Sequence, residues 1–230
     1  NNNYDVSISF LEEMNIINIL TGRNMNTVLS IRTYLSYLFH RNSFYDILYV
    51  FFIKCFYNKS DYVIAQTQSV KNDLITNFNI LEKKVLVIPN PYNLEEIQKD
   101  SKLPLEEKKE IEFSFPIISN IGQLYKYKGH WHLIRLFSKV KKEIHNAKLF
   151  LIGNGELADE LIALSKKIGL NVFLFETDKI DRNADIFFWG QQENPFNLLS
   201  RSDIYLHTSI LEGFPNALVE AMSCGIPVLS

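Results

Sequence analysis

The stretch that decides the fold is DIYLHTSILEGFPNALVEAMSCGIPVLS, residues 203–230. It begins with a strand-like run, DIYLHTS, and ends with another, PVLS. Between them, Pro215 suits the first turn of a helix and Gly225 suits its end. We therefore expect a strand, a helix of about ten residues and a second strand, which together form a parallel βα unit.

This stretch carries two glutamates beside an apolar run. Glu220 interrupts the apolar residues of the helix and shares a polar stripe with Asn216 and Ser223, at spacings i, i+4 and i+7. We expect its side chain to point out of the core, where its two carboxylate oxygens suit the hydroxyls of a ribose or sugar diol. Glu212 lies just before the helix, beside the backbone N–H of Gly213. The alternative is that neither residue binds a ligand, and that Glu220 is an ordinary surface residue and Glu212 an ordinary loop residue.

The same alternation of strands and helices continues upstream in two successive series. Short β-branched or aromatic runs are separated by stretches with helical periodicity, which is typical of parallel βα units. We expect two Rossmann-like domains, residues 1–91 and 113–230, with ligand chemistry at the carboxyl ends of their strands. The polar stretch from Asn90 to Glu112 contains two prolines, so we expect a linker at residues 92–112 that holds a short helix.

A candidate anion site follows the first strand of the second domain. NIGQLYKYKGH, residues 120–130, places Gly122 at the strand end, and Lys126 and Lys128 before Gly129 and the next helix. Glycines let the backbone approach a phosphate, a helix N-terminus offers N–H groups, and a lysine adds a point charge. Such a turn suits a diphosphate without a metal. The alternative is a solvated basic loop.

Composition excludes several classes of protein. The chain of 230 residues has a formal net charge of −2, which does not indicate a nucleic-acid-binding protein. Its two cysteines lie far apart, which argues against a disulfide framework and favours a reducing compartment. The five histidines lack metal-ligand spacing, so we expect no metal. We expect His130 and His132 to be turn and surface residues.

The most apolar run, residues 44–57, is too short to span a bilayer. It suits either a core helix or contact with a membrane surface. The first residues contain no signal-peptide pattern and enter a strand-like run almost at once, and the last residues stop within another. We therefore expect the chain to be a fragment, with both domains truncated.

Several motifs in order resemble the retaining family 4 glycosyltransferases. EGFPNALVEAMSCGIPV resembles the Glu-x7-Glu segment of that family, whose usual form is close to EGFGLVLLEAMACGVPV. NIGQLYKYKGHWHLIRLFSKV is similar to its VGRL…KG strand, turn and helix, and AKLFLIGNGELADEL to its IxGxGPLxxxL. FWGQQENPFNLLSRSDIYLHTS resembles FLG…LL…ADVFVLPS, and VLVIPNPYNLEEI resembles VIPNGVD. The resemblance covers residues 61–230 and is specific as a combination.

The resemblance implies the GT-B fold, in which two Rossmann-like domains face one another across a cleft and the second binds a nucleotide-sugar. Glu220 would hold the ribose hydroxyls, Glu212 would lie beside the transferred sugar, and Lys128 would neutralise the diphosphate leaving group. Glu212 and Lys128 are thus the expected catalytic residues. The other expected donor-binding residues are Gly122, Gln123, Gly213, Phe214 and Asn216.

One position departs from the family pattern within the donor site. Gln123 stands where the family usually has an arginine, and glutamine contributes no charge. Either Lys126 compensates, Arg135 or Arg201 reaches the site, or the affinity for the donor is weaker than is typical.

In the first domain, Arg32 stands where many members have a histidine that faces the cleft. It is a candidate cleft residue, able to meet the donor diphosphate or an anionic acceptor such as a lipid diphosphate. The alternative is a structural salt bridge to Glu12 or Glu13.

The resemblance implies a hexosyl- or N-acetylhexosaminyltransferase that needs no cofactor or metal. We expect a UDP-linked donor, a glycan or polyprenyl-diphosphate-linked acceptor, retention of configuration, and a role in surface polysaccharide or glycolipid synthesis. We also expect a cytoplasmic location, with peripheral contact at the inner face of the membrane. The alternatives are a non-catalytic nucleotide- or glycan-binding protein on the same scaffold and a GT-B nucleotide-sugar epimerase.

Overall fold

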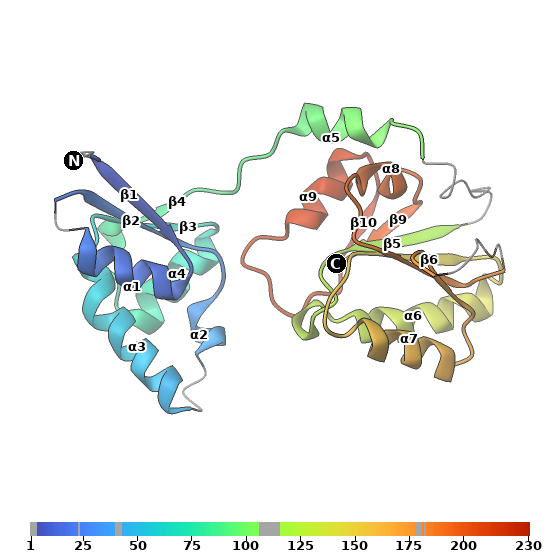
Figure 1. Cartoon of the computed structure of the whole chain (residues 1–230), viewed down its shortest axis with the longest axis horizontal. Helices are drawn as coiled ribbons and strands as arrows, with labels where there is room; N and C mark the ends of the chain where they lie inside the picture. The colour runs from blue at the N-terminus through green and yellow to red at the C-terminus, as the bar shows by residue number, and fades with distance from the viewer. Residues whose placement is uncertain (1–3, 23, 40–42, 106–115, 178–180, 182) are drawn as a thin grey trace. The chain divides into compact units, whose positions relative to one another are not determined.

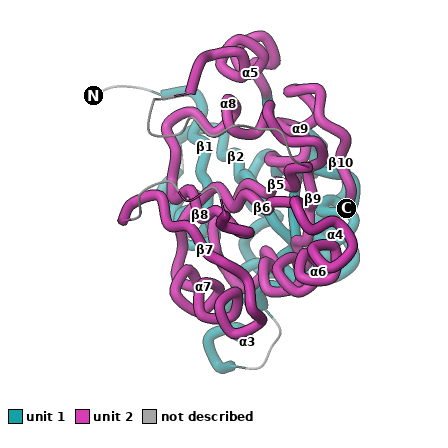
Figure 2. Tube along the Cα trace, turned by 90° about the vertical axis from the view of Figure 1, so that its right-hand side faces the viewer, with its two compact units in different colours: residues 1–91, 212–214 teal, residues 92–211, 215–230 magenta. Residues whose placement is uncertain are grey.

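The computed structural model describes the chain except for residues 1–3, 23, 40–42, 106–115, 178–180 and 182. By its contacts the chain divides into two compact units (Figure 2). Unit 1 contains residues 1–91 and 212–214, and unit 2 contains residues 92–211 and 215–230.

Unit 1 is built on a four-stranded parallel sheet with the order β1-β2-β3-β4. Its strands are β1 Val6–Phe10, β2 Asn26–Ile31, β3 Tyr62–Ala65 and β4 Val85–Val87. Its helices are α1 Glu12–Thr21, α2 Leu35–Leu38, α3 Phe44–Phe56 and α4 Gln68–Phe78, with short 3-10 turns η1 Tyr57–Lys59 and η2 Glu82–Lys84.

The core of unit 1 lies between β2 and β3 of the sheet and helices α3 and α4. Leu29 and Ile31 of β2 are fully buried, as are Val63 and Ala65 of β3. Successive side chains of a strand point to opposite faces of the sheet, so these alternate residues share one face, and the helices cover that face. Thr67 caps α4, because its side chain accepts a hydrogen bond from the backbone N–H at the third helical position.

Unit 2 is built on a six-stranded sheet with the order β10-β9-β5-β6-β8-β7, and all neighbouring strands are parallel. Its strands are β5 Ile117–Ile121, β6 Lys148–Ile152, β7 Val172–Leu174, β8 Ile186–Gly190, β9 Ile204–Leu206 and β10 Val228–Leu229. Its helices are α5 Leu94–Ser101, α6 His130–Glu143, α7 Ala158–Lys167, α8 Phe196–Leu199 and α9 Asn216–Ser223, with a 3-10 turn η4 Lys126–Lys128.

Helices cover both faces of the unit 2 sheet. Figure 1 shows α6 and α7 on one face and α5, α8 and α9 on the other. Along β6, Leu149 and Leu151 pack into one core cluster, while Phe150 and Ile152 pack into another. This two-sided burial explains why Leu149, Phe150, Leu151 and Ile152 follow one another as an unbroken apolar run. The parallel α/β architecture expected from the sequence is confirmed.

The first part of the stretch expected to be a linker, residues 92–105, belongs instead to unit 2. Ile97 is buried, and the backbone oxygens of Asp100 and Ser101 accept hydrogen bonds from Asn194 (2.9 Å) and Ser200 (2.7 Å). Although α5 is mostly charged, its one apolar face packs against α8 and α9 and holds the helix there. The rest of the expected linker, residues 106–112, lies outside the described residues.

Candidate functional site

The carboxyl edge of the unit 2 sheet carries most of the residues that the sequence suggested. Gly122 and Gln123 follow β5, which lies beside β9 in the sheet. The connection after β9 leads into α9, where Asn216 and Glu220 lie. Ligands of parallel α/β sheets bind at this edge, because the strand-to-helix turns place helix N-termini there.

Lys128 lies across the end of β5. Its Cδ and Cε atoms are each 3.9 Å from the position that a Cβ on Gly122 would occupy. Its own turn, η4, leads through Gly129 directly into α6. Gly129 has a φ of 68°, a left-handed conformation that glycine adopts without the strain that other residues would suffer. The lysine ammonium is therefore held near a strand end and the N-terminus of a long helix.

The turn that contains Lys128 is joined to the connection after β9. Thr208 donates from Oγ1 to the Lys128 carbonyl at 3.1 Å, and the N–H of Ile210 donates to the Tyr127 carbonyl at 2.7 Å. A Cβ on Gly129 would lie only 2.2 Å from the Thr208 carbonyl oxygen, so no larger residue fits without a backbone shift. Main-chain contacts thus bring the basic turn and the segment that leads to α9 together.

Helix α9 presents Glu220 from a half-buried position. Burial raises the pKa of the Glu220 carboxyl above its ordinary value. Burial and the negative charge of Glu220 together raise the pKa of Cys224, at the end of the helix, to about 11. At its other end α9 begins directly after Pro215. Glu220 is therefore a carboxylate partly withdrawn from water, on the helix that follows the end of β9.

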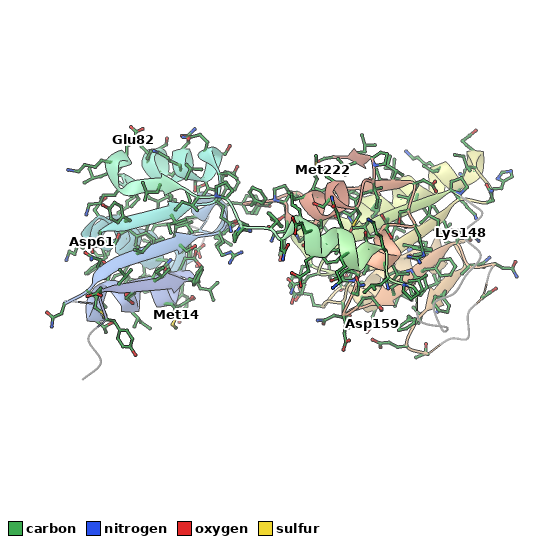
Figure 3. The ribbon with its side chains drawn as sticks, turned by 90° about the horizontal axis from the view of Figure 1, so that it is seen from above. Met14, Asp61, Glu82, Lys148, Asp159 and Met222 are labelled. Carbon is green, nitrogen blue, oxygen red and sulfur yellow. The ribbon has the colours of Figure 1, made fainter. Side chains whose placement is uncertain are left out.

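Two residues of the polar stripe expected on α9, Asn216 and Ser223, form hydrogen bonds within the protein. Ser223 turns its hydroxyl back to donate to the Val219 carbonyl at 2.7 Å. Asn216 accepts a hydrogen bond from the Tyr92 hydroxyl. Met222 is instead a strongly exposed residue of this helix, and Figure 3 labels it at α9. Glu220 is thus the carboxylate that α9 offers to a ligand.

Glu212, Gly213 and Phe214 group with unit 1 by their contacts. Gly213 is buried, and a Cβ there would lie 2.0 Å from the carbonyl oxygen of Arg32. Two positions that the sequence singled out, Gly213 and Arg32, are therefore in direct backbone contact.

Sequence reasoning missed a buried hydrogen-bonded pair beneath Lys128. His130, expected in a turn or at the surface, is only 1% exposed, and its Nε2 lies 2.9 Å from Asn120 Oδ1. Asn120 donates its amide N–H to the Leu206 carbonyl at 2.6 Å, so its oxygen is the acceptor and His130 carries its proton on Nε2. Burial, with a contribution from the Lys128 charge, lowers the pKa of His130 to about 4. An asparagine inside an apolar strand was the available signal.

The salt bridge considered for Arg32 is not formed. In the described part of the chain, Arg32 interacts with the Asn90 side chain (3.5 Å) and the Gln66 amide, and with neither glutamate of the β1–α1 turn. Glu13 instead accepts a hydrogen bond from the Tyr49 hydroxyl at 3.1 Å. The structural alternative is therefore wrong for this side chain.

The cations that were considered as replacements for the missing arginine at Gln123 occupy different places. Arg201 donates to the backbone carbonyl of Asn197, one helical turn earlier. Lys126 lies in the same 3-10 turn as Lys128. Lys126 is therefore close in the chain to the diphosphate position that the sequence suggested.

A cavity of about 420 Å³ opens at the carboxyl ends of β6, β7 and β8. Its volume lies in the range of small-molecule sites, about 300–1,000 Å³. Asp159, which Figure 3 labels, and Glu176 line it, and among its lining residues there is no lysine or arginine. The sequence analysis did not single out this cavity. Its lining comprises Leu124, Gly153, Asn154, Gly155, Ala158, Asp159, Ile162, Leu174, Phe175, Glu176, Thr177, Phe188 and Gly190.

In the described part of the chain, histidines, cysteines and carboxylates do not gather in groups of three that could hold a metal ion. No described helix is long and apolar enough to cross a membrane.

Comparison with known proteins gives consistent matches along the chain. Residues 102–230 match the family Glycosyl transferases group 1, and residues 9–96 match Glycosyltransferase Family 4. The chain is 35% identical to the uncharacterized glycosyltransferase MJ1059 of Methanocaldococcus jannaschii, over 83% of this chain and 44% of that protein.

A second relative has an assigned activity. The chain is 28% identical to N-acetylgalactosamine-N,N'-diacetylbacillosaminyl-diphospho-undecaprenol 4-alpha-N-acetylgalactosaminyltransferase of Campylobacter jejuni, over 98% of this chain and 57% of that protein. The chain thus spans about half the length of these curated relatives.

A similar solved structure is Anabaena Alr3699/HepE in complex with UDP-glucose. It has a TM-score of 0.75 and 19% sequence identity, and the match covers 98% of this chain and 59% of that chain. This likeness shows the fold, and it agrees with the two parallel α/β units described above. Because the first family match covers more than half of its residues, the chain belongs to the glycosyl transferases group 1 family and has the fold class of the GT-B glycosyltransferases.

Proposed function

We propose that the chain forms the core of a retaining glycosyltransferase that moves a hexosyl or N-acetylhexosaminyl group from a UDP-linked donor to a glycan or polyprenyl-diphosphate-linked acceptor. Its role is then in surface polysaccharide or glycolipid synthesis, at the cytoplasmic face of a membrane. Family membership supports the transferase class. The UDP-glucose complex of the similar structure supports the donor class, and the name of the Campylobacter jejuni relative supports a lipid-diphosphate acceptor.

The observation that carries this proposal is the contact between the Lys128 turn and the β9–α9 connection. Two hydrogen bonds, from Thr208 and Ile210, hold that turn against the connection that leads from β9 into α9. We take a cation, a helix N-terminus and the half-buried carboxylate of Glu220, further along this connection on α9, as parts of one site. This combination suits a nucleoside diphosphate, because its phosphates are anionic and its ribose carries two neighbouring hydroxyls.

The residues can then share the chemistry. As the nucleoside diphosphate leaves the anomeric carbon, negative charge develops on the phosphate, and the ammonium of Lys128 is positioned to stabilise it. The carboxylate of Glu220 accepts hydrogen bonds from the ribose hydroxyls. Glu212 lies beside the transferred sugar without acting as a nucleophile. The acceptor attacks from the side that the leaving group vacates, and the leaving phosphate takes the acceptor proton, which retains configuration and needs no metal.

Peripheral membrane contact belongs to the same proposal. Phe44, Tyr45, Ile47 and Phe51 of α3 are each more than half exposed. A helix with large apolar side chains toward solvent can lie in a membrane interface, where a polyprenyl-linked acceptor is anchored. Replacement of Phe44 and Phe51 by serine should reduce co-sedimentation with phospholipid vesicles and leave the reaction with a soluble acceptor analogue unchanged.

The test uses the full protein with candidate UDP-sugars and a polyprenyl-diphosphate-linked sugar, and follows released UDP and the elongated product. Glu220→Ala should mainly weaken UDP binding, whereas Glu212→Ala should lower turnover with little change in UDP affinity. Glu143→Gln, an exposed carboxylate at the far end of α6, is the matched control. Wild-type activity in both test variants would remove the site assignment.

A non-catalytic nucleotide-binding protein is the second candidate, because an uncharged Gln123 stands at the exposed turn after β5. UDP-sugar binding without UDP release, for every donor and acceptor pair tried, would favour that function.

A further inference from the structure

Arg32 follows β2 in unit 1, and neighbouring side chains hold its guanidinium in place. Its Nη2 donates to Asn90 Oδ1 at 3.5 Å. Its Cζ lies 5.9 Å from the ring centroid of Phe10, at the end of the adjacent strand β1. Arg32 is an exposed residue. Arg32 is thus a cation at the surface whose position is set from below.

Gln66, which is 5% exposed, is the main support of Arg32. In one orientation its amide nitrogen donates to Asn90 Oδ1 at 2.6 Å. In the other orientation its oxygen accepts from Arg32 Nε at 3.1 Å and its nitrogen donates to the Arg32 carbonyl at 3.2 Å. Amide oxygen and nitrogen occupy nearly the same positions in both. Only the second orientation satisfies both ends of the amide, and in it the oxygen also accepts from Asn90 Nδ2 at 3.2 Å. In that orientation a buried amide connects Arg32 with Asn90 and restricts the arginine before any ligand arrives.

These side chains lie at the carboxyl edge of the unit 1 sheet. Arg32 follows β2, Gln66 follows β3, and Asn90 follows β4, in a sheet whose strands are all parallel. Thr67, the next residue after Gln66, caps the eleven-residue helix α4. The positive end of that helix is therefore one residue from Gln66, and it favours an anion at the same edge.

The charge of Arg32 is not neutralised within the described part of the chain. None of its contacts is with a carboxylate, as the hydrogen bond of Glu13 to Tyr49 also illustrates. An arginine that only stabilised the fold would gain most from an ion pair. Its fork geometry instead matches the oxygens of a phosphate, which it can bind through two parallel hydrogen bonds.

We propose that Arg32, positioned by Gln66 and Asn90, binds the diphosphate of a substrate. The inference rests on the proposed function, which supplies two diphosphates: that of the UDP-linked donor and that of the lipid-linked acceptor. Both present the same pair of anionic phosphates to the guanidinium. The experiment therefore measures the two separately.

Binding is measured for wild type and Arg32→Gln with two probes, UDP in solution and undecaprenyl diphosphate in phosphatidylcholine vesicles. The loss of a charge-assisted bidentate contact should weaken binding of one probe by about tenfold or more. A loss confined to UDP identifies the donor, and a loss confined to the vesicles identifies the acceptor. Unchanged affinity for both probes would overturn the proposal.

Lys83→Gln is the matched control. Lys83 is an exposed cation of the same unit, in the turn just before β4 and so at the opposite, amino-terminal edge of the sheet. It should bind both probes as wild type does. Because no sugar transfer is measured, a wild type that binds the probes but never transfers a sugar would count against the proposed function and leave this inference intact.

Gln66→Glu tests whether Arg32 binds through its charge, without a change of shape. The new carboxylate would pair with Arg32 and hold it firmly, but it would cancel the charge. Affinity for the same probe should fall about as far as in Arg32→Gln, and its salt dependence should flatten, while the thermal midpoint stays at or above that of wild type. A variant that loses affinity only together with its thermal midpoint, or one that binds as wild type does, would contradict a binding role for the Arg32 charge.

Discussion

The carboxyl edges of the two sheets are held together by different kinds of contact. In unit 2 the strand-end turns are joined through the main chain, as Gly129 against the Thr208 carbonyl and Gly153 against the Gly122 carbonyl illustrate. In unit 1 Gly213 also lies against a carbonyl, that of Arg32, but the ends of β2, β3 and β4 are joined to one another through side-chain amides, chiefly that of Gln66. The first edge therefore depends on the absence of Cβ atoms, and the second depends on polar groups that can be exchanged one at a time.

Both units also contain buried side chains that hydrogen-bond to one another. Beneath α1 of unit 1, Asn18 donates to Ser9 Oγ at 3.0 Å, and Ser9 donates to Asn15 Oδ1 at 2.7 Å. Beneath α6 of unit 2, the Asn120 and His130 pair is the polar counterpart. Buried polar groups specify one packing arrangement only while each keeps its partners. Variants that remove a single contact should therefore change the stability of the unit that contains it and leave the other unit unchanged.

The largest effect is expected for Gly129→Ala. The new Cβ would lie 2.2 Å from the Thr208 carbonyl and would force a residue other than glycine to a φ of 68°. Strain and overpacking together should destabilise unit 2 by about 3 kcal/mol or more. Urea unfolding measures the loss, and UDP binding should fall with it, because the Lys128 turn must move.

Gly169→Ala is the control for Gly129→Ala. Gly169 also has a positive φ, 85°, but nothing lies within 4 Å of its Cβ position. Only the conformational strain remains, about 1–2 kcal/mol, and UDP binding should be unchanged. Equal losses of stability in the two variants would show that the close approach to Thr208 is unimportant.

The next effect is expected in unit 1, for Asn18→Ala. This side chain is 7% exposed, and its amide donates to Ser9 Oγ and also approaches the Ser7 and Val28 carbonyls at 3.2 and 3.4 Å. Removal of the amide should cost about 2 kcal/mol of unfolding free energy, because it leaves buried acceptors without a partner. Asn72→Ala, at an exposed position of α4, should cost less than about 0.5 kcal/mol. A loss that appears in the unit 2 transition would contradict the division into separately held units.

The pH dependence of stability should distinguish the polar pair of unit 2. The pKa of His130 is about 4 in the folded chain, below its ordinary value of 6.5. Above pH 6.5 the histidine is neutral in the folded and in the unfolded chain. Between pH 6.5 and 4 it takes up a proton in the unfolded chain only, so the free energy of unfolding decreases as the pH is lowered. His130→Gln should remove a loss on the order of 1–2 kcal/mol between pH 7.5 and 5. Identical pH profiles for wild type and variant would refute the assignment.

The smallest effect is expected for Gln123→Arg, at an exposed position of the main-chain edge. The added charge near Lys126 and Lys128 should preserve affinity for UDP or improve it by a few-fold. Gln98→Arg, at an exposed position of α5, makes the same change of charge away from this turn and should leave affinity unchanged. A large loss of activity on Gln123→Arg would show that the glutamine has another task.

Much of the fold could be predicted because its signals are local. The runs DIYLHTS and PVLS contain β9 Ile204–Leu206 and β10 Val228–Leu229, and the helix expected between them is α9 Asn216–Ser223. Buried parallel strands are short and largely apolar, whereas the helices are longer and repeat at 3.6 residues, so run length and periodicity together separate them. The docking of α5 was missed, because one buried isoleucine in a charged helix gives no clear pattern.

The candidate site was predicted in part. Lys128 lies at the end of β5 and Glu220 lies on α9, because glycine and proline mark these strand-to-helix turns in the chain itself. Their roles toward a donor stay predictions. His130 was misplaced, since a helix-starting histidine looks the same in sequence whether or not an asparagine ten residues earlier reaches it. The cavity lined by Asp159 and Glu176 was not foreseen, because its walls come from strands that are adjacent only in the folded sheet.

The sequence by itself determined the order of strands and helices, the glycines of the turns, and the motifs that carry family membership, because each depends on residues close together in the chain. Only the tertiary structure decided that Lys128 lies over Gly122, that His130 is neutral and buried, and that Arg32 rests on Gln66 without a carboxylate partner. Those outcomes depend on strand order and on competition among neighbours, and neither is written in any local stretch of residues.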